Sequence, residues 1–383
     1  MSNPFLIKGM RETVERLLGA VTKKERIIIL TDADPDGVTS AVILKEALEA
    51  LGNPPFFVYF PNIEKEGYGL SEAALNFLKD KSPALLMTLD CGIGNFREIE
   101  LAKKNGFEVI VIDHHEILGG LPRASIIIDP KQEKDGSAFR ELCAAGLVYK
   151  LARALLFEAQ VKFAPERFLE LAVIATLSDQ MPRIGENEKI LNDGLLSLKY
   201  TEREGLRALI EVSGLREFDQ NEIREKIISP LASAGLKNHK SEAYLLLTEN
   251  SFEKSVKMAK ALLKKSKLRR ERVSQIFEEA EERIDASLPL VFLGDPGWPV
   301  TLVGTVASKI HQKYKRPTFI FKKGKTKSRG SVRTPKEINS VKMMASCSSL
   351  LETYGGHSQA SGFAIKNQNL EKFKECLIKY LDQ

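Results

Sequence analysis

The stretch RIIILTDADPDGVTSAVILKEALEAL, residues 26–51, decides the fold of this chain. It opens with an apolar run at 27–30, passes through a turn rich in Asp, Pro and Gly, and continues into a helix expected over 39–51. An uninterrupted apolar run of this length is typical of a strand buried on both faces. The stretch therefore predicts a strand, a turn carrying Asp32, Asp34 and Asp36, and a helix.

The same pattern recurs through the first half of the chain. Further apolar runs alternate with expected helices, the runs at 56–60, 85–89, 109–112 and 126–128 and the helices at 71–80 and 96–105. This alternation predicts an α/β domain built on a doubly wound parallel sheet. Ligands bind such a sheet beyond the carboxyl ends of its strands. Asp90 follows the third run, and Asp113, His114 and His115 follow the fourth.

The remainder predicts a helical region and a second, smaller α/β domain. We expect residues 140–215 to be helical. Residues 252–284 are expected to form one helix of ~33 residues, which would be ~50 Å long. The alternative is two helices with a break near Ser266. The second domain has expected strands at 289–293, 317–321 and 362–365, and expected helices at 303–314, 338–351 and from 370. We expect a catalytic domain over 1–215, a helical linker over 216–287 and a substrate-binding domain over 288–383.

Composition favours a soluble protein with one strongly basic part. The 383 residues carry a net charge of +6, but residues 286–383 hold 16 Lys and Arg against 6 Asp and Glu. The excess indicates a nucleic-acid partner or a solvated lysine surface. We expect no membrane span and no signal peptide. The 4 cysteines lie far apart without a CxxC pair, which argues against a disulfide framework or a zinc ribbon and favours the cytoplasm.

The three clustered aspartates predict a metal site. Asp32, Asp34 and Asp36 repel one another at the end of a buried strand unless a cation lies among them. The alternative is a solvated acidic turn, because Asp, Pro and Gly are turn formers. An EF-hand is excluded, since no Glu stands at the twelfth position and a strand precedes the motif.

Three other groups of residues fit the same site. Asp90 fits a bridging ligand or a helix N-cap. His114 fits a ligand and His115 a contact to substrate phosphate, with buried structural histidines as the alternative. Asp179 either closes the site or belongs to a helix-end turn. Imidazole and carboxylate together suit manganese better than calcium, and the set is large enough for two ions that hydrolyse a phosphoester.

The second domain carries a candidate anion site. Gly355, Gly356 and His357 form a glycine-rich turn whose amides can face an anion. Arg329 and Arg333 lie in an expected basic turn, where a guanidinium can bind a phosphate. The alternative for the glycines is two loops that flank a strand.

These motifs resemble the DHH phosphoesterase superfamily. DADPDG, the lone Asp90, the DHH triplet and Asp179 look like its four motifs, and GGHSQASG and RGSVRT look like its DHHA1 accessory domain. Four further stretches resemble the RecJ single-strand exonuclease branch, namely EKEGYGL (64–70), AAGLVYKLARAL (144–155), ENEKI (186–190) and GWPVTLVGTVASKI (297–310).

The resemblance implies a role for each matching residue. It places Asp36, Asp90, His114 and His115 in catalysis, and substrate in an interdomain cleft. The implied metal ligands are Asp32, Asp34, Asp36, Asp90, His114 and Asp179. The implied substrate-binding residues are His115, Arg329, Arg333, Gly355, Gly356 and His357.

The implied activity is that of a RecJ-like nuclease in DNA repair or replication. It would release mononucleotides from single-stranded nucleic acid with two Mn²⁺ ions, or Mg²⁺ in their place, and with a replication or helicase protein as a further partner.

The chain also departs from the bacterial RecJ pattern. Ile63, Leu231 and Leu236 stand where that pattern has arginines, and the sequence ends at Gln383 without the OB-fold, as in compact archaeal relatives. These departures keep two alternatives open. One is a phosphodiesterase of short oligonucleotides or cyclic dinucleotides, and the other is a non-catalytic replication scaffold.

Overall fold

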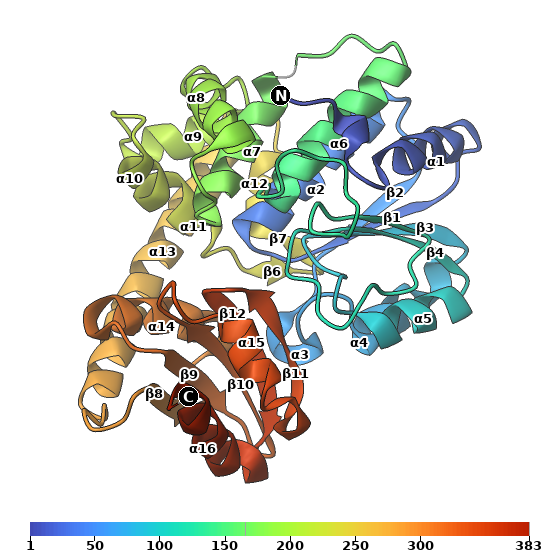
Figure 1. Ribbon diagram of the computed structural model, residues 1–383. Coiled ribbons are helices and arrows are strands. Elements are labelled where there is room, and N and C mark those ends of the chain that lie inside the picture. The colour runs from blue at the N-terminus through green and yellow to red at the C-terminus, as the bar shows by residue number, and fades with distance from the viewer. Residues whose placement is uncertain (165, 383) are drawn as a thin grey trace. The chain divides into compact units, whose positions relative to one another are not determined.

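The computed structural model describes residues 1–164 and 166–382. The chain divides into two compact units, Met1–Ser266 and Lys267–Gln383, and each is described by itself (Figure 1). The three parts expected, with boundaries at 215 and 287, stay a prediction. Side chains beyond residue 215, including Ile223, Leu246 and Ala259, are buried in the main core of the first unit.

The first unit is built on a five-stranded parallel sheet, which confirms the predicted fold class. Its strands are β1 (Ile27–Thr31), β2 (Phe56–Tyr59), β3 (Ala84–Leu89), β4 (Phe107–Ile112) and β5 (Ile126–Ile128). Their order is β2-β1-β3-β4-β5, and every pair is parallel. The chain runs outward from β1 to β2 and then returns to β3 on the other side. The ends of β1 and β3 therefore flank the switch point, where α/β sheets bind ligands.

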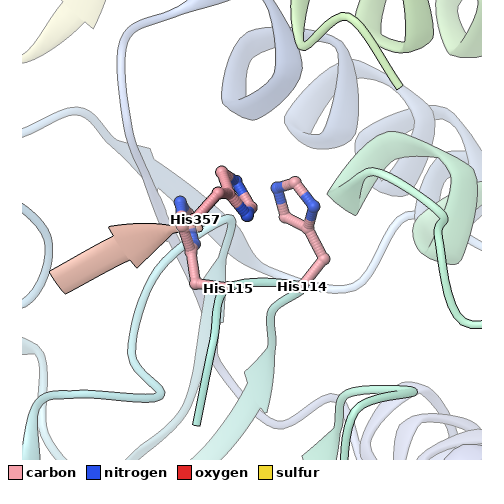
Figure 2. Close-up of side chains that lie close together, drawn as sticks. All are labelled: His114, His115 and His357. Atoms are coloured by element: carbon pink, nitrogen blue, oxygen red, sulfur yellow. The ribbon is translucent and has the colours of Figure 1, made fainter. Parts of the chain in front are cut away.

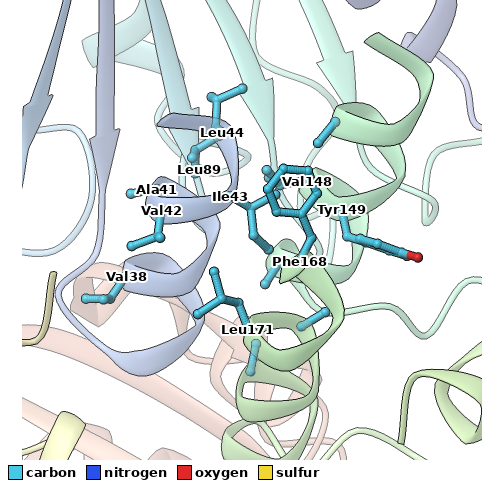
Figure 3. Close-up of a cluster of buried hydrophobic side chains, with 14 of the residues drawn as sticks. Val38, Ala41, Val42, Ile43, Leu44, Leu89, Val148, Tyr149, Phe168 and Leu171 are labelled. Carbon is cyan, nitrogen blue, oxygen red and sulfur yellow. The ribbon is translucent and has the colours of Figure 1, made fainter. Parts of the chain in front are cut away.

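Helices cover both faces of this sheet. One face packs against α1 (Met10–Thr22), α2 (Pro35–Ala50), α6 (Ala144–Glu158) and α7 (Glu166–Ser178), and the other against α4 (Glu72–Leu78) and α5 (Phe96–Lys104). Ile29 faces the first core and Ile28 the second, which is why the strands read as continuous apolar runs. Figure 3 shows Ile43, Val148 and Leu171 within the first core.

The rest of the first unit is mainly helical, as predicted for 140–215. The remaining elements are α3 (Ile63–Glu66), α8 (Gly185–Lys199), α9 (Glu204–Ser213), α10 (Gln220–Ile223), α11 (Ser229–Leu231), α12 (Glu242–Leu247) and the short strands β6 (Leu236–Lys237) and β7 (Lys240–Ser241). Helix α13 (Phe252–Glu281) runs unbroken through Ser266. The prediction of one long helix is confirmed, and the alternative of a break is wrong.

The second unit contains a mixed five-stranded sheet of order β11-β12-β10-β9-β8. Its strands are β8 (Val291–Asp295), β9 (Thr318–Lys323), β10 (Lys327–Arg333), β11 (Leu351–His357) and β12 (Ala360–Lys366). Strands β8 and β9 are parallel, and the other neighbours are antiparallel. Its helices after α13 are α14 (Val300–Tyr314), α15 (Ser340–Ala345) and α16 (Leu370–Leu381).

Three local predictions for this unit are wrong. The expected basic turn with Arg329 and Arg333 is strand β10, and the expected glycine-rich turn lies in strand β11. The helix expected over 338–351 is only the six-residue α15. Strands β10 and β11 expose much of one face and carry polar or glycine residues there. Their sequences therefore lack the apolar run that marks a doubly buried strand.

The cysteines also differ from expectation. Cys347 and Cys376 form a single disulfide, which the argument against a disulfide framework did not anticipate, whereas Cys91 and Cys143 are buried free thiols. The pair is 29 residues apart in sequence, and its Cα atoms are 6.1 Å apart because α15 and α16 pack on the same core. Among the described residues, no helix combines the length and apolarity needed to cross a bilayer.

Candidate metal centre

The turn between β1 and α2 is a tightly held acidic loop. Helix α2 begins at Pro35 rather than near residue 39, because Asp34 caps it by accepting a hydrogen bond from the Gly37 amide at 3.0 Å. Residue 37 must be glycine for steric reasons, since a Cβ there would lie 2.4 Å from the Asp32 carbonyl oxygen. The turn therefore holds its three carboxylates in fixed positions.

Asp36 is anchored by the start of another helix. Its two carboxylate oxygens accept hydrogen bonds from the amides of Ala144 and Ala145, at 2.8 and 2.7 Å, and its side chain is fully buried. These amides belong to the first turn of α6, where free N–H groups and the helix dipole favour a negative charge. The α6 N-terminus thus fixes the orientation of Asp36.

Four side chains converge on one point beyond the sheet. The His114 Nε2 atom lies 3.1 Å from Asp90 Oδ1, 3.4 Å from Asp179 Oδ2 and 3.5 Å from Asp36 Oδ2. One ligand atom from each of the four residues lies within 4.8 Å of the other three. Asp90 reaches this point from the end of β3 in a left-handed conformation, with φ at 57°. One nitrogen and three carboxylate oxygens form a donor set that suits a divalent metal such as Mn²⁺.

Asp113 organises the neighbouring histidine. Its Oδ1 atom lies 2.6 Å from His115 Nδ1 and accepts the His114 amide at 2.8 Å, while Oδ2 accepts the Ile93 amide at 2.9 Å. The His114 and His115 rings lie side by side, with centroids 4.8 Å apart (Figure 2). Burial alone would raise the pKa of Asp113, but the charge of His115 and the hydrogen bonds outweigh burial and lower this pKa. Asp113 therefore remains ionised and orients His115.

Burial and mutual repulsion make this site costly without a cation. Burial raises the pKa of Asp32 to about 7 and that of Asp36 to about 6. Burial and the charges of neighbouring aspartates raise the pKa of Asp90 and of Asp179 well above the usual value. These carboxylates lose water, and Asp36, Asp90 and Asp179 share the single imidazole of His114. A divalent cation would compensate their charge, so the residues present fit a metal site.

Asp32 and Asp34 lie at the margin of this centre. Neither belongs to the group of four, although Asp34 contributes to the raised pKa of Asp90 and Asp32 to that of Asp179. Asp32 is buried and Asp34 is half-buried. The structure thus brings ligand atoms of four of the six expected residues within 4.8 Å of one another, and Asp32 and Asp34 lie outside that group.

Sequence reasoning assigned no role to Asp113 or Asp129. Asp129 follows β5 directly, is fully buried, and has an Oδ2 atom without a hydrogen-bond partner among the described residues. Burial raises the pKa of Asp129 to about 8. Each of the two residues is the first after a strand of the parallel sheet. That position is the sequence signal for both residues, and for Asp113 it was noted from the sequence without a role being assigned.

The expected substrate residues of the second unit lie on one sheet. Arg329 and Arg333 are on β10, and His357 is at the end of β11. The Arg333 guanidinium is fixed by Ser308 of α14, whose Oγ accepts from Nε at 2.9 Å. A Cβ at Gly355 would meet nothing within 4 Å, and Gly356 has a φ of 130°, which favours glycine. Both glycines lie in β11, so the alternative of two flanking loops is also wrong.

Two family models match the chain. The N-terminal domain of the DHH family matches residues 26–176, and the DHHA1 domain matches residues 286–383. The chain belongs to the DHH/DHHA1 family. The resemblance drawn from the sequence motifs is thereby confirmed. The DHH match covers the parallel sheet with the turn at Asp32–Asp36, Asp90 and the DHH triplet, and the DHHA1 match covers the mixed sheet.

Within the DHH/DHHA1 family the chain is similar to RecJ. The single-stranded-DNA-specific exonuclease RecJ of Bacillus subtilis is 33% identical over 388 residues, which cover 99% of this chain and 48% of that protein. The structure of Thermus thermophilus RecJ in complex with Mn²⁺ matches with a TM-score of 0.84 and 27% identity, over 98% of this chain and 55% of that one.

A further solved structure is matched over nearly its whole length. The structure of an exonuclease RecJ bound to manganese has a TM-score of 0.80 and 28% identity, over 98% of this chain and 95% of that one. By contrast, this chain spans about half the length of the curated RecJ proteins of Bacillus subtilis and Thermus thermophilus.

Proposed function

We propose that this chain is a metal-dependent phosphodiesterase, a RecJ-like exonuclease that releases mononucleotides from single-stranded nucleic acid. The observation that carries the proposal is the convergence of Asp36, Asp90, His114 and Asp179 on one buried point. The similarity to RecJ, including two RecJ structures described as containing Mn²⁺, supports the same activity and metal. We propose two Mn²⁺ ions, with Mg²⁺ as the alternative.

The chain's own residues would hold the metals and position the substrate. Asp36, Asp90, His114 and Asp179 would bind the ions, and Asp32 and Asp34 would add negative charge beside them. Two divalent ions at such a site activate a water molecule and stabilise the leaving oxygen of a phosphodiester. A protein nucleophile is then unnecessary.

His115 is suited to contact the scissile phosphate. Although burial opposes it, the ion pair with Asp113 raises the pKa of His115. A protonated His115 can donate to a phosphate oxygen while Asp113 holds its other nitrogen. In the second unit, Arg329, Arg333, His357 and the amides of Gly355 and Gly356 would bind further phosphate oxygens of the strand.

A nuclease assay with Mn²⁺ tests this function. Single strands of DNA and RNA, labelled at either end, are compared for the wild-type chain, Asp90→Ala and His114→Ala. Asp80→Asn is the matched control, because Asp80 is an exposed carboxylate of the same unit. We expect release of labelled mononucleotides from one end by the wild type and the control only.

The other outcomes separate the two remaining candidate functions. If dinucleotides are cleaved and long strands are not, the chain is a small-substrate phosphodiesterase rather than an exonuclease. The absence of the RecJ-pattern arginines at Ile63, Leu231 and Leu236 would then explain the lack of activity on long strands. If the chain binds metal but cleaves none of these substrates, the non-catalytic replication scaffold is the candidate function that remains. Because the proposed substrate is cellular nucleic acid, we also propose a cytoplasmic location.

A further inference from the structure

The second unit carries a row of basic side chains along one strand. In strand β10 the side chains at 327, 329, 331 and 333 point to one face of the sheet, since side chains alternate along a strand. They are Lys327, Arg329, Ser331 and Arg333. The intervening residues Ser328 and Val332 are buried on the other face.

The neighbouring strands β9 and β12 add further lysines to this row, near the Lys327 end of β10. In the sheet register, Lys322 of β9 lies directly opposite Arg329, and Lys366 of β12 lies directly opposite Lys327. Directly opposite residues share a face of the sheet. Lys327 and Lys366 are exposed and Lys322 is half-buried. Three lysines thus surround the outer end of β10.

On the same face, the neighbouring strands β12 and β11 carry small residues beside this row. Strand β12 contributes Ala360, Gly362 and Ala364, and β11 contributes Gly355 opposite Gly362. The nearest atom to a Cβ placed at Gly362 is 3.5 Å away, and a Cβ at Gly355 would meet nothing within 4 Å. A chain can therefore lie close to the backbone here.

The opposite face of the sheet is closed by a core. Phe319, Val332 and Phe363 pack there against Met343 of α15 and Phe373 of α16. Lys323, which lies opposite Ser328 at the end of β9, is an exposed cation on that side of the sheet. The face with the β10 row carries the larger group of basic side chains on the strands themselves.

Carboxylates offset this charge only in part. Glu352 of β11 forms an ion pair with Lys327 at 2.8 Å, and Asp295 of β8 lies opposite Lys322 but also pairs with Arg283 at 3.1 Å. From Lys309 to Arg333 the sequence contains no acidic residue. The face therefore keeps an excess of positive charge.

We propose that Lys322, Lys327 and Lys366 extend the substrate site of the second unit into a track for the sugar–phosphate backbone of a single strand. Lys327 and Arg333 are six residue steps apart along β10, a span of ~20 Å at ~3.4 Å per strand residue. A dinucleotide is too short to cover this span, and a longer strand can. The inference rests on the proposed function. In that function Arg333 binds one part of the single strand, and the three lysines would bind the part that extends beyond it.

Binding of labelled oligothymidylates to the full chain tests the track. Affinities are measured in chelator, so that no strand is cleaved, for a 20-mer and a dinucleotide at several salt concentrations. The track variant carries Lys322→Gln, Lys327→Gln and Lys366→Gln. The matched control carries Lys342→Gln, Lys372→Gln and Lys379→Gln, which remove the same charge from exposed positions on α15 and α16.

We expect the track variant to bind the 20-mer at least ~10-fold more weakly and to lower the slope of log affinity against log salt by about 2, at ~0.7 per lost phosphate contact. The control should bind within ~2-fold of the wild type, because its lysines lie outside the track. Equal losses in both variants, or no loss in the track variant, would overturn the inference.

The same measurement separates this inference from the proposed function. A chain that cleaves nothing but shows the expected difference in binding would refute the exonuclease and keep the track. A chain that cleaves single strands while the track variant binds like the wild type would keep the exonuclease and refute the track.

Discussion

Asp90 is a buried carboxylate whose neighbours are mostly other carboxylates. Its burial and the charges of Asp36, Asp34 and Asp179 raise its pKa well above the usual value. We expect Asp90→Asn to lower Mn²⁺-dependent nuclease activity by at least ~10³-fold and to raise the Tm of the metal-free chain. The amide keeps the shape of the side chain and removes a buried charge.

Nuclease rates and thermal unfolding in chelator measure the two effects together. Asp80→Asn serves again as the exposed control and should change neither quantity. A fall in both activity and metal-free Tm for Asp90→Asn would show that Asp90 is a structural residue, and would contradict its assignment to the metal site.

Ser308 positions the Arg333 guanidinium. Its hydroxyl accepts from Arg333 Nε at 2.9 Å and donates to the Gly304 carbonyl at 3.0 Å. We expect Ser308→Ala to raise KM for single strands by ~10-fold with kcat nearly unchanged, because a hydrogen bond to a charged group contributes about 1.5–3 kcal/mol. Steady-state kinetics with Ser308→Thr as the conservative variant test this. Equal losses in both variants, or a loss in kcat alone, would argue against it.

At the scale of elements, the start of α2 depends on a glycine. A Cβ at position 37 would lie 2.4 Å from the Asp32 carbonyl oxygen and 2.6 Å from Thr31 Oγ1. We expect Gly37→Ala to displace the acidic turn, to weaken Mn²⁺ binding by at least ~10-fold, and to destabilise the chain by about 1–3 kcal/mol. Calorimetry and denaturant unfolding measure these effects. Gly94→Ala, where a Cβ meets nothing within 4 Å, is the control, and equal Mn²⁺ affinity in both variants would contradict the steric argument.

The elements of the first unit were predictable because each strand is buried on both faces. Runs such as 27–30 and 109–112 contain almost no polar residue, and the acidic residues that follow them mark the functional edge of the sheet. Asp36, Asp90 and His114 could therefore be selected from the sequence alone. Asp179 follows a helix rather than a strand, so the sequence left a helix-end turn open as its alternative, and the fold brings Asp179 to the other three residues.

Other features could not be predicted from local pattern. Strands β10 and β11 expose one face and carry Arg329, Ser331 and Gly355 there, so their composition resembles that of loops. The role of Asp113 depends on its hydrogen bonds to His115 and to the Ile93 amide, and no periodicity encodes them. The Cys347–Cys376 disulfide likewise depends on the packing of α15 and α16.

For the molecule as a whole, the acidic site makes metal-free stability depend on pH. The pKa is about 7 for Asp32 and about 6 for Asp36 in the folded chain, against a usual value of 3.8. Between pH ~4 and pH ~7, the folded state therefore binds more protons than the unfolded state. The free energy of unfolding then falls as pH rises through this range.

We expect Tm in chelator to be at least ~5 °C lower at pH 8 than at pH 5, and Mn²⁺ to raise Tm far more at pH 8 than at pH 5. Thermal unfolding at the two pH values, with and without Mn²⁺, measures both effects. A metal-free Tm that is flat or rises over this range would contradict the assignment of uncompensated buried carboxylates.

The central claim is that this buried cluster of carboxylates and histidine exists to bind divalent metal. Calorimetric titration of the metal-free chain with Mn²⁺ at pH 8, beside Asp90→Asn and the Asp80→Asn control, tests it most directly. We predict two ions per chain for the wild type and the control, and fewer than two, or much weaker binding, for Asp90→Asn. A folded wild-type chain that binds no Mn²⁺, or an Asp90→Asn variant that binds it like the wild type, would contradict the account.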